Sequence, residues 1–315
     1  MTQQSMPNQT ANLRPDHRPD HRSDHRAYHR ADHRADHRPD QVADQAMRNI
    51  ATTPCPLCDA PASQATPTMQ HDRWKLLRCN TCQLVYLDNP ASISELSSEQ
   101  RWTASYESER AKRRERRPIV TALKDMLRPI QLALRPHKLL ALINRELPRG
   151  GVVLDLGCGN GHHMARLPST ITPIGIDLDP DGVRVADIAY RARGGRVMLG
   201  SAIDELQKLA PGSVDAAILM AYLEHEPRPL ESLRVLHRCL KPNGSIIIKV
   251  PNLNSWNRRV TGAKWCGYRF PDHVTYFTPR TLRATIEAAG FGVARFGIRD
   301  RFPTSDNMWM VARAK

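Results

Sequence analysis

Apolar runs and helix-periodic stretches alternate along the second half of the chain. Two stretches, 180–193 and 227–240, repeat apolar positions at three- and four-residue spacing, as amphipathic helices do. Five short segments are almost wholly apolar and predict buried strands: 151–157, 171–179, 195–202, 213–221 and 244–252. Strands that alternate with helices indicate an α/β fold with a parallel sheet covered on both faces. Segments 291–300 and 307–315 predict two further strands.

The region before this pattern is also helix-periodic. Residues 117–134 and 138–147 carry apolar positions at helical spacing, and Pro129 and Pro136 divide them into pieces. We expect a helical linker or cap over residues 91–149. Such a basic amphipathic helix can lie on a membrane surface, although packing of its apolar face on the domain that follows is the favoured interpretation.

A four-residue unit, x-Asp-His-Arg, repeats through residues 14–40. It offers almost no apolar side chain to bury, so residues 1–50 are expected to form a disordered, low-complexity tail. Regularly spaced imidazoles can bind metal, but every one here is flanked by a cation that opposes a metal ion. The histidines concerned are His17, His21, His25, His29, His33 and His37.

The chain has 315 residues, a formal net charge of +14 and a pI near 9.8. The excess positive charge lies in residues 101–149 and in the last third, because Arg and Asp nearly balance in the repeat. A net positive charge of this size fits a nucleic acid or anionic lipid partner. It equally fits solvated helix faces together with an acidic small-molecule substrate.

Four of the seven cysteines fall in two CxxC pairs. Two such pairs at this separation have the spacing of a structural Zn²⁺ site without an open coordination position. The sequence therefore predicts a small zinc ribbon over residues 51–90, with strands at 74–79 and 84–87. His71 could replace one of the cysteines as a ligand, but four cysteines make it unnecessary. A thioredoxin-like redox pair is the alternative, but neither pair lies in a βαβ pattern. The proposed ligands are Cys55, Cys58, Cys79 and Cys82.

Cysteine usage also bears on the compartment. The spacing does not resemble a secreted disulfide framework, no apolar run approaches the length of a membrane span, and the N-terminus has no apolar signal region. We therefore expect a cytoplasmic protein without a transmembrane segment.

Three alternating glycines follow the strand at 151–157 and form the pattern GxGxG. Glycines allow close backbone approach to a nucleotide-type ligand at the carboxyl edge of a parallel sheet. A dinucleotide fingerprint requires a further glycine at 162, where this chain has His162. Asp177 ends the second strand and is placed to accept bonds from ribose hydroxyls. Since Asp155 would face a pyrophosphate, an adenosine-type cofactor other than NAD is indicated.

These motifs resemble class I S-adenosylmethionine-dependent methyltransferases, especially the branch of ubiquinone-biosynthesis O-methyltransferase-like proteins. The resemblance rests on VLDLGCGNG, GIDLDP, the stretch SVDAAILMAYLEHEPRPLESLRVLHRCLKPNGSIIIKVPN, and PDHVTYFTPRTLRATIEAAGF. It covers residues 150–315 as a methyltransferase domain and implies a Rossmann-like fold. That fold has a mostly parallel seven-stranded sheet with an antiparallel last strand. The preceding CxxC pairs are similar to the ribbon of zinc-containing sugar C-methyltransferases.

The resemblance also implies which residues bind S-adenosylmethionine. Asp155 and the glycine turn would line its methionine part, and Asp177 would hold its ribose. Ser201 and Ala202 fall at the adenine contacts, where the commonest pattern has Asp at position 201. The full set implied for the cofactor is Asp155, Gly157, Cys158, Gly159, Gly161, Asp177, Leu178, Ser201 and Ala202.

Methyl transfer needs a base only where the acceptor must lose a proton. His225, after the fourth strand, and His273, in the segment after the fifth, are candidate bases, and Glu224 is placed to orient His225 or to meet the cofactor. Tyr276 is a further candidate. Each of these residues can equally be structural. The aromatic residues Trp256, Trp265 and Tyr268, interleaved with arginines, suggest either a lid over an anionic or ring-bearing substrate or the packing of a loop.

The sequence thus favours a methyltransferase acting on a small-molecule, carbohydrate or lipid-linked acceptor, with S-adenosylmethionine and structural Zn²⁺ as cofactors. Peripheral membrane contact stays open. One alternative is an RNA methyltransferase, which the basic excess and the ribbon support, although no aromatic and basic RNA-binding module is recognisable. The other is a non-catalytic zinc-ribbon binding protein with a vestigial domain, against which the intact Asp155 and Asp177 weigh.

Overall fold

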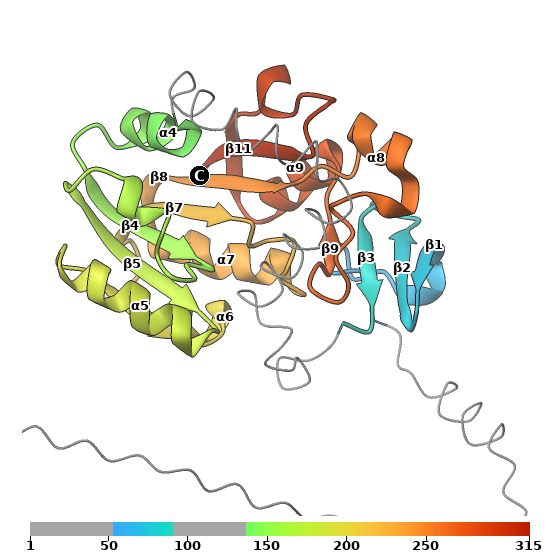
Figure 1. Ribbon diagram of the computed structural model, residues 1–315, viewed down its shortest axis with the longest axis horizontal. Coiled ribbons are helices and arrows are strands. Elements are labelled where there is room, and N and C mark those ends of the chain that lie inside the picture. Colours follow the sequence, from blue (N-terminus) through green and yellow to red (C-terminus); the bar gives the residue numbers. More distant parts are fainter. Residues whose placement is uncertain (1–52, 91–136) are drawn as a thin grey trace, which may run out of the picture. The chain divides into compact units, whose positions relative to one another are not determined.

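The computed structural model describes residues 53–90 and 137–315 (Figure 1). Within them, seven strands form one sheet in the order β10, β11, β8, β7, β4, β5, β6. The strands from β4 to β8 run parallel, and β11 lies antiparallel between β8 and β10. The α/β class and the antiparallel last strand are therefore confirmed. The strands are β4 (Gly151–Leu156), β5 (Ile171–Asp177), β6 (Arg196–Leu199), β7 (Val214–Met220), β8 (Leu240–Pro251), β10 (Phe291–Arg295) and β11 (Asn307–Ala314).

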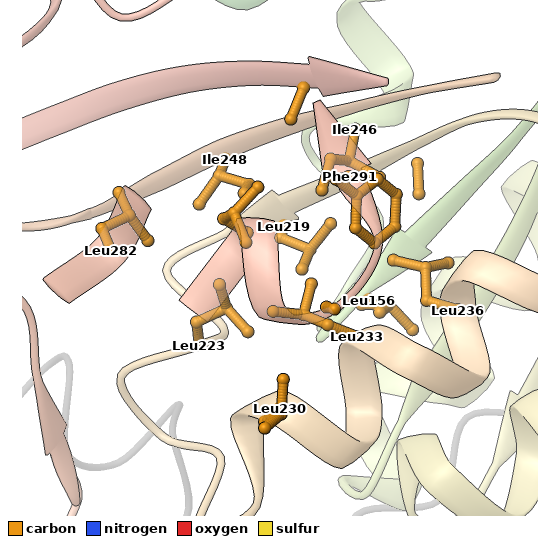
Figure 2. Packing of buried hydrophobic residues seen from close by; sticks show 14 of the residues in the cluster. Leu156, Leu219, Leu223, Leu230, Leu233, Leu236, Ile246, Ile248, Leu282 and Phe291 are labelled. Atoms are coloured by element: carbon orange, nitrogen blue, oxygen red, sulfur yellow. The ribbon is translucent and has the colours of Figure 1, made fainter. Parts of the chain in front are cut away.

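Helices cover both faces of this sheet. One face packs against α4 (Lys138–Glu146) and α5 (Pro180–Arg191), and the other against α6 (Ala202–Gln207), α7 (Pro229–Cys239) and α9 (Pro279–Ala288). Figure 2 shows leucines of α7 gathered around Leu219, Ile248 and Phe291. Burial of this apolar stripe against the sheet provides most of the stability of such helices.

A second sheet is made of four short antiparallel strands. These are β1 (Ala65–His71), β2 (Trp74–Cys79), β3 (Val85–Asp88) and β9 (Thr275–Tyr276). The ribbon strands expected near 74–79 and 84–87 are confirmed. Strand β1 was not predicted, because ATPTMQH has no apolar run and is mostly exposed.

Two strand boundaries differ from the expected pattern, and the glycine turn leads into one 3₁₀ turn, Met164–Arg166. Strand β8 begins at Leu240, so KPNG, expected to lie outside it, falls within the strand. The strand expected over 291–300 ends at Arg295, and a 3₁₀ turn, Ile298–Asp300, follows.

The remaining short elements are a 3₁₀ turn at Ala62–Gln64, helix α8 (Trp256–Thr261) and a 3₁₀ turn at Gly262–Lys264. The predictions for the tail, for the repeat at 14–40 and for a helix at 117–134 lie outside the described residues. In the part of the chain that the structure covers, no helix is long and apolar enough to cross a membrane.

Candidate functional site

The glycine turn connects β4 to the 3₁₀ turn and has an unusual backbone. Gly157, Gly159 and Gly161 have φ values of 71°, 50° and 78°, in the left-handed region that favours glycine. A Cβ atom at Gly161 would lie 2.8 Å from Cε1 of Tyr190, and one at Gly157 would lie 3.2 Å from Cδ2 of Tyr222. The turn at the carboxyl end of β4 therefore requires glycine, both for its backbone conformation and for its close packing.

Asp177 fixes this turn from the end of β5. Its Oδ2 accepts a hydrogen bond from the backbone N–H of Gly159 at 2.7 Å, and its Oδ1 accepts one from Asp179 at 2.8 Å. Burial raises the pKa of this carboxyl, while the two backbone bonds oppose that shift. Each carboxylate oxygen keeps a second lone pair for a ligand hydroxyl.

Asp155 lies beneath the turn and is fully buried. Its Oδ2 accepts a hydrogen bond from the hydroxyl of Tyr190 at 3.0 Å, and its Oδ1 has no partner among the described residues. Burial raises the pKa of this carboxyl to about 7. An orphaned buried carboxyl oxygen beside a glycine cradle fits a ligand that brings a cationic amine.

The other residues that the resemblance implies for cofactor binding differ in how far their side chains are exposed. Leu178, after β5, is an exposed apolar side chain, whereas Ala202 is buried in the core. The hydroxyl of Ser201 caps α6, where it accepts from the backbone of Asp204 at 3.3 Å. Cys158 points into the core, and its N–H donates to the carbonyl of Ile176, so it offers a ligand no free donor.

The structure brings Glu224, His225 and His273 together after β7. Ligand-type atoms of the three side chains lie within 4.8 Å of one another, and the two imidazole rings are 4.7 Å apart in an edge-to-face arrangement. The Nδ1 atom of His225 is 2.8 Å from the carbonyl oxygen of Asp272, and that of His273 is 2.8 Å from the carbonyl oxygen of Gly267. The sequence had predicted each residue separately, and the fold makes them one cluster.

Burial sets the protonation of this cluster. It lowers the pKa of His225 to about 4 and lowers that of His273 well below its usual range, so both imidazoles are neutral at pH 7. Each Nδ1–H then donates to its carbonyl, which leaves the Nε2 lone pair free. Nε2 of His225 is buried without a partner among the described residues. Burial raises the pKa of Glu224 to about 8, so this carboxyl holds its proton.

Two residues that the sequence reasoning missed also border the site. Lys249 is half-buried on β8, burial lowers its pKa, and the nearby Glu224 carboxyl opposes that shift. The signal that could have found it is a lysine inside the apolar run IIIKV. Tyr222 lies against Gly157 and donates to Oε2 of Glu226 at 2.6 Å.

Backbone hydrogen bonds tie the ribbon to this cluster. The N–H groups of Val274 and Thr275 both donate to the carbonyl of Glu224, at 2.8 and 3.1 Å. On the other side of this segment, Leu87 of β3 donates to the carbonyl of Val274 at 2.8 Å, and β3 pairs with β9. The ribbon thus holds the segment that carries His273.

The four ribbon cysteines lie together and are not disulfide-bonded. The Sγ atoms of Cys55 and Cys82 are 3.4 Å apart, those of Cys58 and Cys79 are 3.5 Å apart, and all four lie within 4.8 Å of one another. His71 is not part of this cluster. Four sulfur atoms in this arrangement fit one tetrahedral metal ion.

Trp256, Trp265 and Tyr268, for which the sequence suggested either a lid or the packing of a loop, differ in their surroundings. Trp265 is buried, donates through Nε1 to Asp306 at 2.6 Å, and packs edge-to-face on Tyr268. Trp265 forms a hydrophobic cluster with Tyr276 and with ribbon residues such as Leu76, and Tyr268 packs against this cluster. The structure therefore supports loop packing for Trp265 and Tyr268. Trp256 is exposed.

Comparison with known proteins agrees with this architecture. A family model described as a methyltransferase domain matches residues 131–295. A ubiquinone biosynthesis O-methyltransferase of Xanthomonas axonopodis pv. citri is 32% identical over 168 residues, which are 50% of this chain and 70% of that protein. One of Cupriavidus pinatubonensis is 31% identical over 151 residues, 45% of this chain and 60% of that protein.

Solved structures with a similar chain trace include a 1,6-didemethyltoxoflavin-N1-methyltransferase of Burkholderia thailandensis. It is 18% identical, with a TM-score of 0.44, over 80% of this chain and 100% of that chain. An S-adenosylmethionine-dependent methyltransferase of Archaeoglobus fulgidus is also 18% identical, with a TM-score of 0.44, over 62% of this chain and 99% of that chain.

Proposed function

The chain belongs to the methyltransferase-domain family and is an S-adenosylmethionine-dependent methyltransferase, and we propose that it methylates a hydroxyl oxygen of a small-molecule acceptor. The observation that carries this proposal is the neutral imidazole pair of His225 and His273, in the segments that follow β7 and β8. A hydroxyl must lose its proton as its oxygen is methylated, and a neutral imidazole takes such a proton. The similar ubiquinone biosynthesis enzymes are named O-methyltransferases, which supports an oxygen acceptor.

In this proposal the carboxyl edge of β4, β5 and β6 would hold the cofactor. Asp155 and the turn through Gly157, Gly159 and Gly161 would bind its methionine part, and Asp177 would accept hydrogen bonds from its ribose hydroxyls. The exposed Leu178 and the start of α6, at Ser201 and Ala202, would hold the adenine. When bound, S-adenosylmethionine supplies an electron-poor methyl group, so the chain need only bind, orient and deprotonate the acceptor.

His225 acts as the base in this mechanism. Its Nδ1–H stays bonded to the carbonyl of Asp272, which fixes the tautomer and presents the Nε2 lone pair to the acceptor hydroxyl. His273 packs edge-on against this ring and holds its orientation. The protonated carboxyl of Glu224 is a hydrogen-bond donor for an acceptor oxygen, since its Oε2 has no partner among the described residues.

The four ribbon cysteines hold a structural Zn²⁺ ion in the same proposal. Cysteine sulfur is the ligand that zinc prefers in closed structural sites, and all four positions of a tetrahedron are filled by the chain. The ion would fold a ribbon whose buried side chains, such as Leu77 and Tyr86, pack in a hydrophobic cluster shared with the main sheet. The ion would affect catalysis only indirectly, because strand β3 of the ribbon supports the segment that carries His273.

The experiment that tests this function has two parts. Calorimetric titration should show binding of S-adenosylmethionine and S-adenosylhomocysteine, but not of NAD, and D177A should abolish it. Transfer of a labelled methyl group to a panel of phenols and catechols should then fall about a hundredfold or more in H225N, with cofactor affinity unchanged. His237, on α7 with its ring 5.0 Å from that of Phe291, supplies the matched control H237N, which should keep full activity.

Two outcomes would refute the proposal. Full activity of H225N would remove His225 as the base, and labelling of amine or carbon acceptors alone would exclude oxygen as the methylated atom.

A further inference from the structure

Lys249 is a lysine inside a mostly buried strand, and it has no role in the function proposed above. It lies two residues before the end of β8, between Met220 of β7 and Trp309 of β11. Its Nζ atom is 5.9 Å from the centre of the Trp309 ring. An ammonium group that is half-buried loses hydration, which makes a negatively charged partner favourable.

Among the described residues, Lys249 has no ion-pair partner. The acid whose charge acts on it is Glu224, but burial raises the pKa of that carboxyl to about 8, so it holds its proton at pH 7. Asp300 is occupied as well, because it pairs with Lys138 at 3.0 Å and with Arg295 at 3.2 Å. The positive charge of Lys249 is therefore not compensated by this part of the chain.

Further basic side chains gather around Lys249. His162, His163 and Arg166 follow the glycine turn, and His137 precedes α4. The rings of His162 and His163 are 3.8 Å apart, and Nδ1 of His137 is buried without a partner among the described residues. Burial lowers the pKa of all three imidazoles, and the charges of Arg166 and Lys249 lower it further. We call these five residues the basic cluster.

Apolar neighbours of these residues pack together and hold the basic cluster in place. Leu139 of α4, Met164 of the 3₁₀ turn and Met220 of β7 belong to one hydrophobic core cluster, and Trp309 packs against it. Parallel sheets of this kind bind ligands at the carboxyl ends of their strands. The basic cluster therefore lies at the edge where a ligand is expected.

Lys249 lies on the acceptor side of this edge. The N–H of Ala221, three residues before Glu224, donates to the carbonyl of Lys249 at 2.9 Å. The ammonium group of Lys249 and the carboxyl of Glu224 also influence each other's pKa. Since His225 is the next residue, an anion bound at Lys249 would belong to the molecule whose hydroxyl meets His225.

The cofactor does not balance the charge of the basic cluster. S-adenosylmethionine has one carboxylate, but also an amine and a sulfonium, so it is a net cation at pH 7. Its carboxylate can compensate either Arg166 or Lys249, but not both. With the cofactor bound, the site would still favour an anion.

We propose that Lys249 and the basic cluster bind a carboxylate or phosphate group of the methyl acceptor. This inference rests on the proposed function. The ammonium group donates charge-assisted hydrogen bonds to such an anion, and the imidazole N–H groups are additional donors. The acceptor is then an anionic hydroxy compound, with its anion at Lys249 and its hydroxyl at His225.

The test is calorimetric titration of the full chain, saturated with S-adenosylhomocysteine. The probes are meta- and para-hydroxybenzoate and the corresponding neutral amides, which differ in charge but little in shape. At least one acid should bind about tenfold or more tightly than its amide. Competition by inorganic phosphate would extend the site to phosphate groups, and its absence would restrict the site to carboxylates.

Variants of Lys249 separate its charge from its packing on Trp309. K249M should remove the preference for the acid, whereas K249R should retain it, because arginine keeps the positive charge. Lys241, on the same strand and paired with Asp215 at 2.6 Å, supplies the matched control K241M, which should keep the preference. Affinity for S-adenosylhomocysteine should stay the same in all three variants.

Three outcomes would overturn the proposal. The first is equal binding of acids and amides, or binding of no acid. The second is a preference that K249M keeps. The third is loss of affinity for S-adenosylhomocysteine in K249M by the same factor as for the acid, which would assign Lys249 to the carboxylate of the cofactor. Because these titrations require no methyl transfer, failure of the proposed O-methylation leaves the test intact.

Discussion

At the scale of single residues, Gly161 shows how tightly the backbone of the glycine turn is constrained. Its φ is 78°, and an added Cβ atom would meet the ring of Tyr190 at 2.8 Å. We predict that G161A costs about 1 to 3 kcal/mol of unfolding free energy and also lowers affinity for S-adenosylhomocysteine. Urea denaturation and calorimetric titration measure the two effects.

Gly212 provides the control for this prediction. Its φ is 64°, but an added Cβ atom would meet nothing within 4 Å. G212A should therefore cost only backbone strain, about 1 to 2 kcal/mol, and leave the cofactor affinity unchanged. Equal losses of affinity in G161A and G212A would show that the contact with Tyr190 does not shape the turn.

Glu224 gives a prediction for the pH dependence of stability. Burial raises its folded-state pKa to about 8, above an unfolded value of about 4.3. The folded chain therefore holds a proton that the unfolded chain releases, and stability is lost as pH rises between these values. His225 acts in the opposite sense, since its folded pKa of about 4 lies below an unfolded value of about 6.5, so its contribution is lost as pH falls.

The variant E224Q isolates the first of these effects. Glutamine cannot ionise, so E224Q should lose less stability than the unsubstituted chain between about pH 5 and about pH 8. Urea unfolding at both pH values measures the difference. Glu231, 46% exposed in its side chain on α7, supplies the control E231Q, which should follow the unsubstituted chain. An unaltered pH slope in E224Q would contradict a buried carboxyl that holds its proton.

The sequence indicates the local geometry of the proposed site residues, but not their burial. Gly157, Asp177 and the four cysteines lie in short motifs whose spacing determines local geometry, so their neighbours in space follow from their neighbours in sequence. Burial of His273 does not follow in that way, since it depends on contacts with Gly267 and with His225, which lies far away in the chain. The two readings of Trp265 were separable only by its tertiary contact with Asp306.

At the scale of elements, the short pairing between β3 and β9 connects the ribbon, with its proposed metal site, to the segment that carries His273. We predict that removal of zinc with a strong chelator, or C79S, lowers methyl transfer about ten- to a hundredfold while affinity for S-adenosylmethionine stays unchanged. The reason is that β3 holds β9, whose neighbour Val274 bonds to the backbone of Glu224. Steady-state kinetics and calorimetry on the same preparation measure the two quantities.

The exposed Cys266 supplies the control for this coupling. C266S should keep both the metal and the activity, whereas C79S should lose bound zinc as measured by atomic absorption. Loss of cofactor affinity together with activity would point to general unfolding and not to the coupling through β9.

Elements with their own apolar pattern could be predicted, and those formed by tertiary pairing could not. Strands β4, β5 and β7 are apolar runs, which become stable once helices cover both faces of the sheet, and α7 carries a clear apolar stripe. The two residues of β9 are a strand only because β3 lies beside them. The antiparallel direction of the last strand, by contrast, followed from the family resemblance, and periodicity alone does not determine which strands become neighbours.

At the scale of the whole molecule, the described ribbon and sheet share buried contacts. Leu76 and Leu87 of the ribbon pack with Leu253, Trp265 and Tyr276 in one hydrophobic cluster, and the strand pairing joins the same parts. We therefore predict one cooperative thermal transition for the full chain. S-adenosylhomocysteine at about 100 times its Kd should add about 2.7 kcal/mol to the free energy of unfolding and so raise the midpoint temperature of that transition. A chelator should lower the same midpoint temperature. Differential scanning calorimetry of the holoprotein measures both shifts, with D177A as the variant in which only the first should vanish. A separate early transition that alone responds to the chelator would mean that the ribbon unfolds independently, and the coupling through β9 would then have no structural basis.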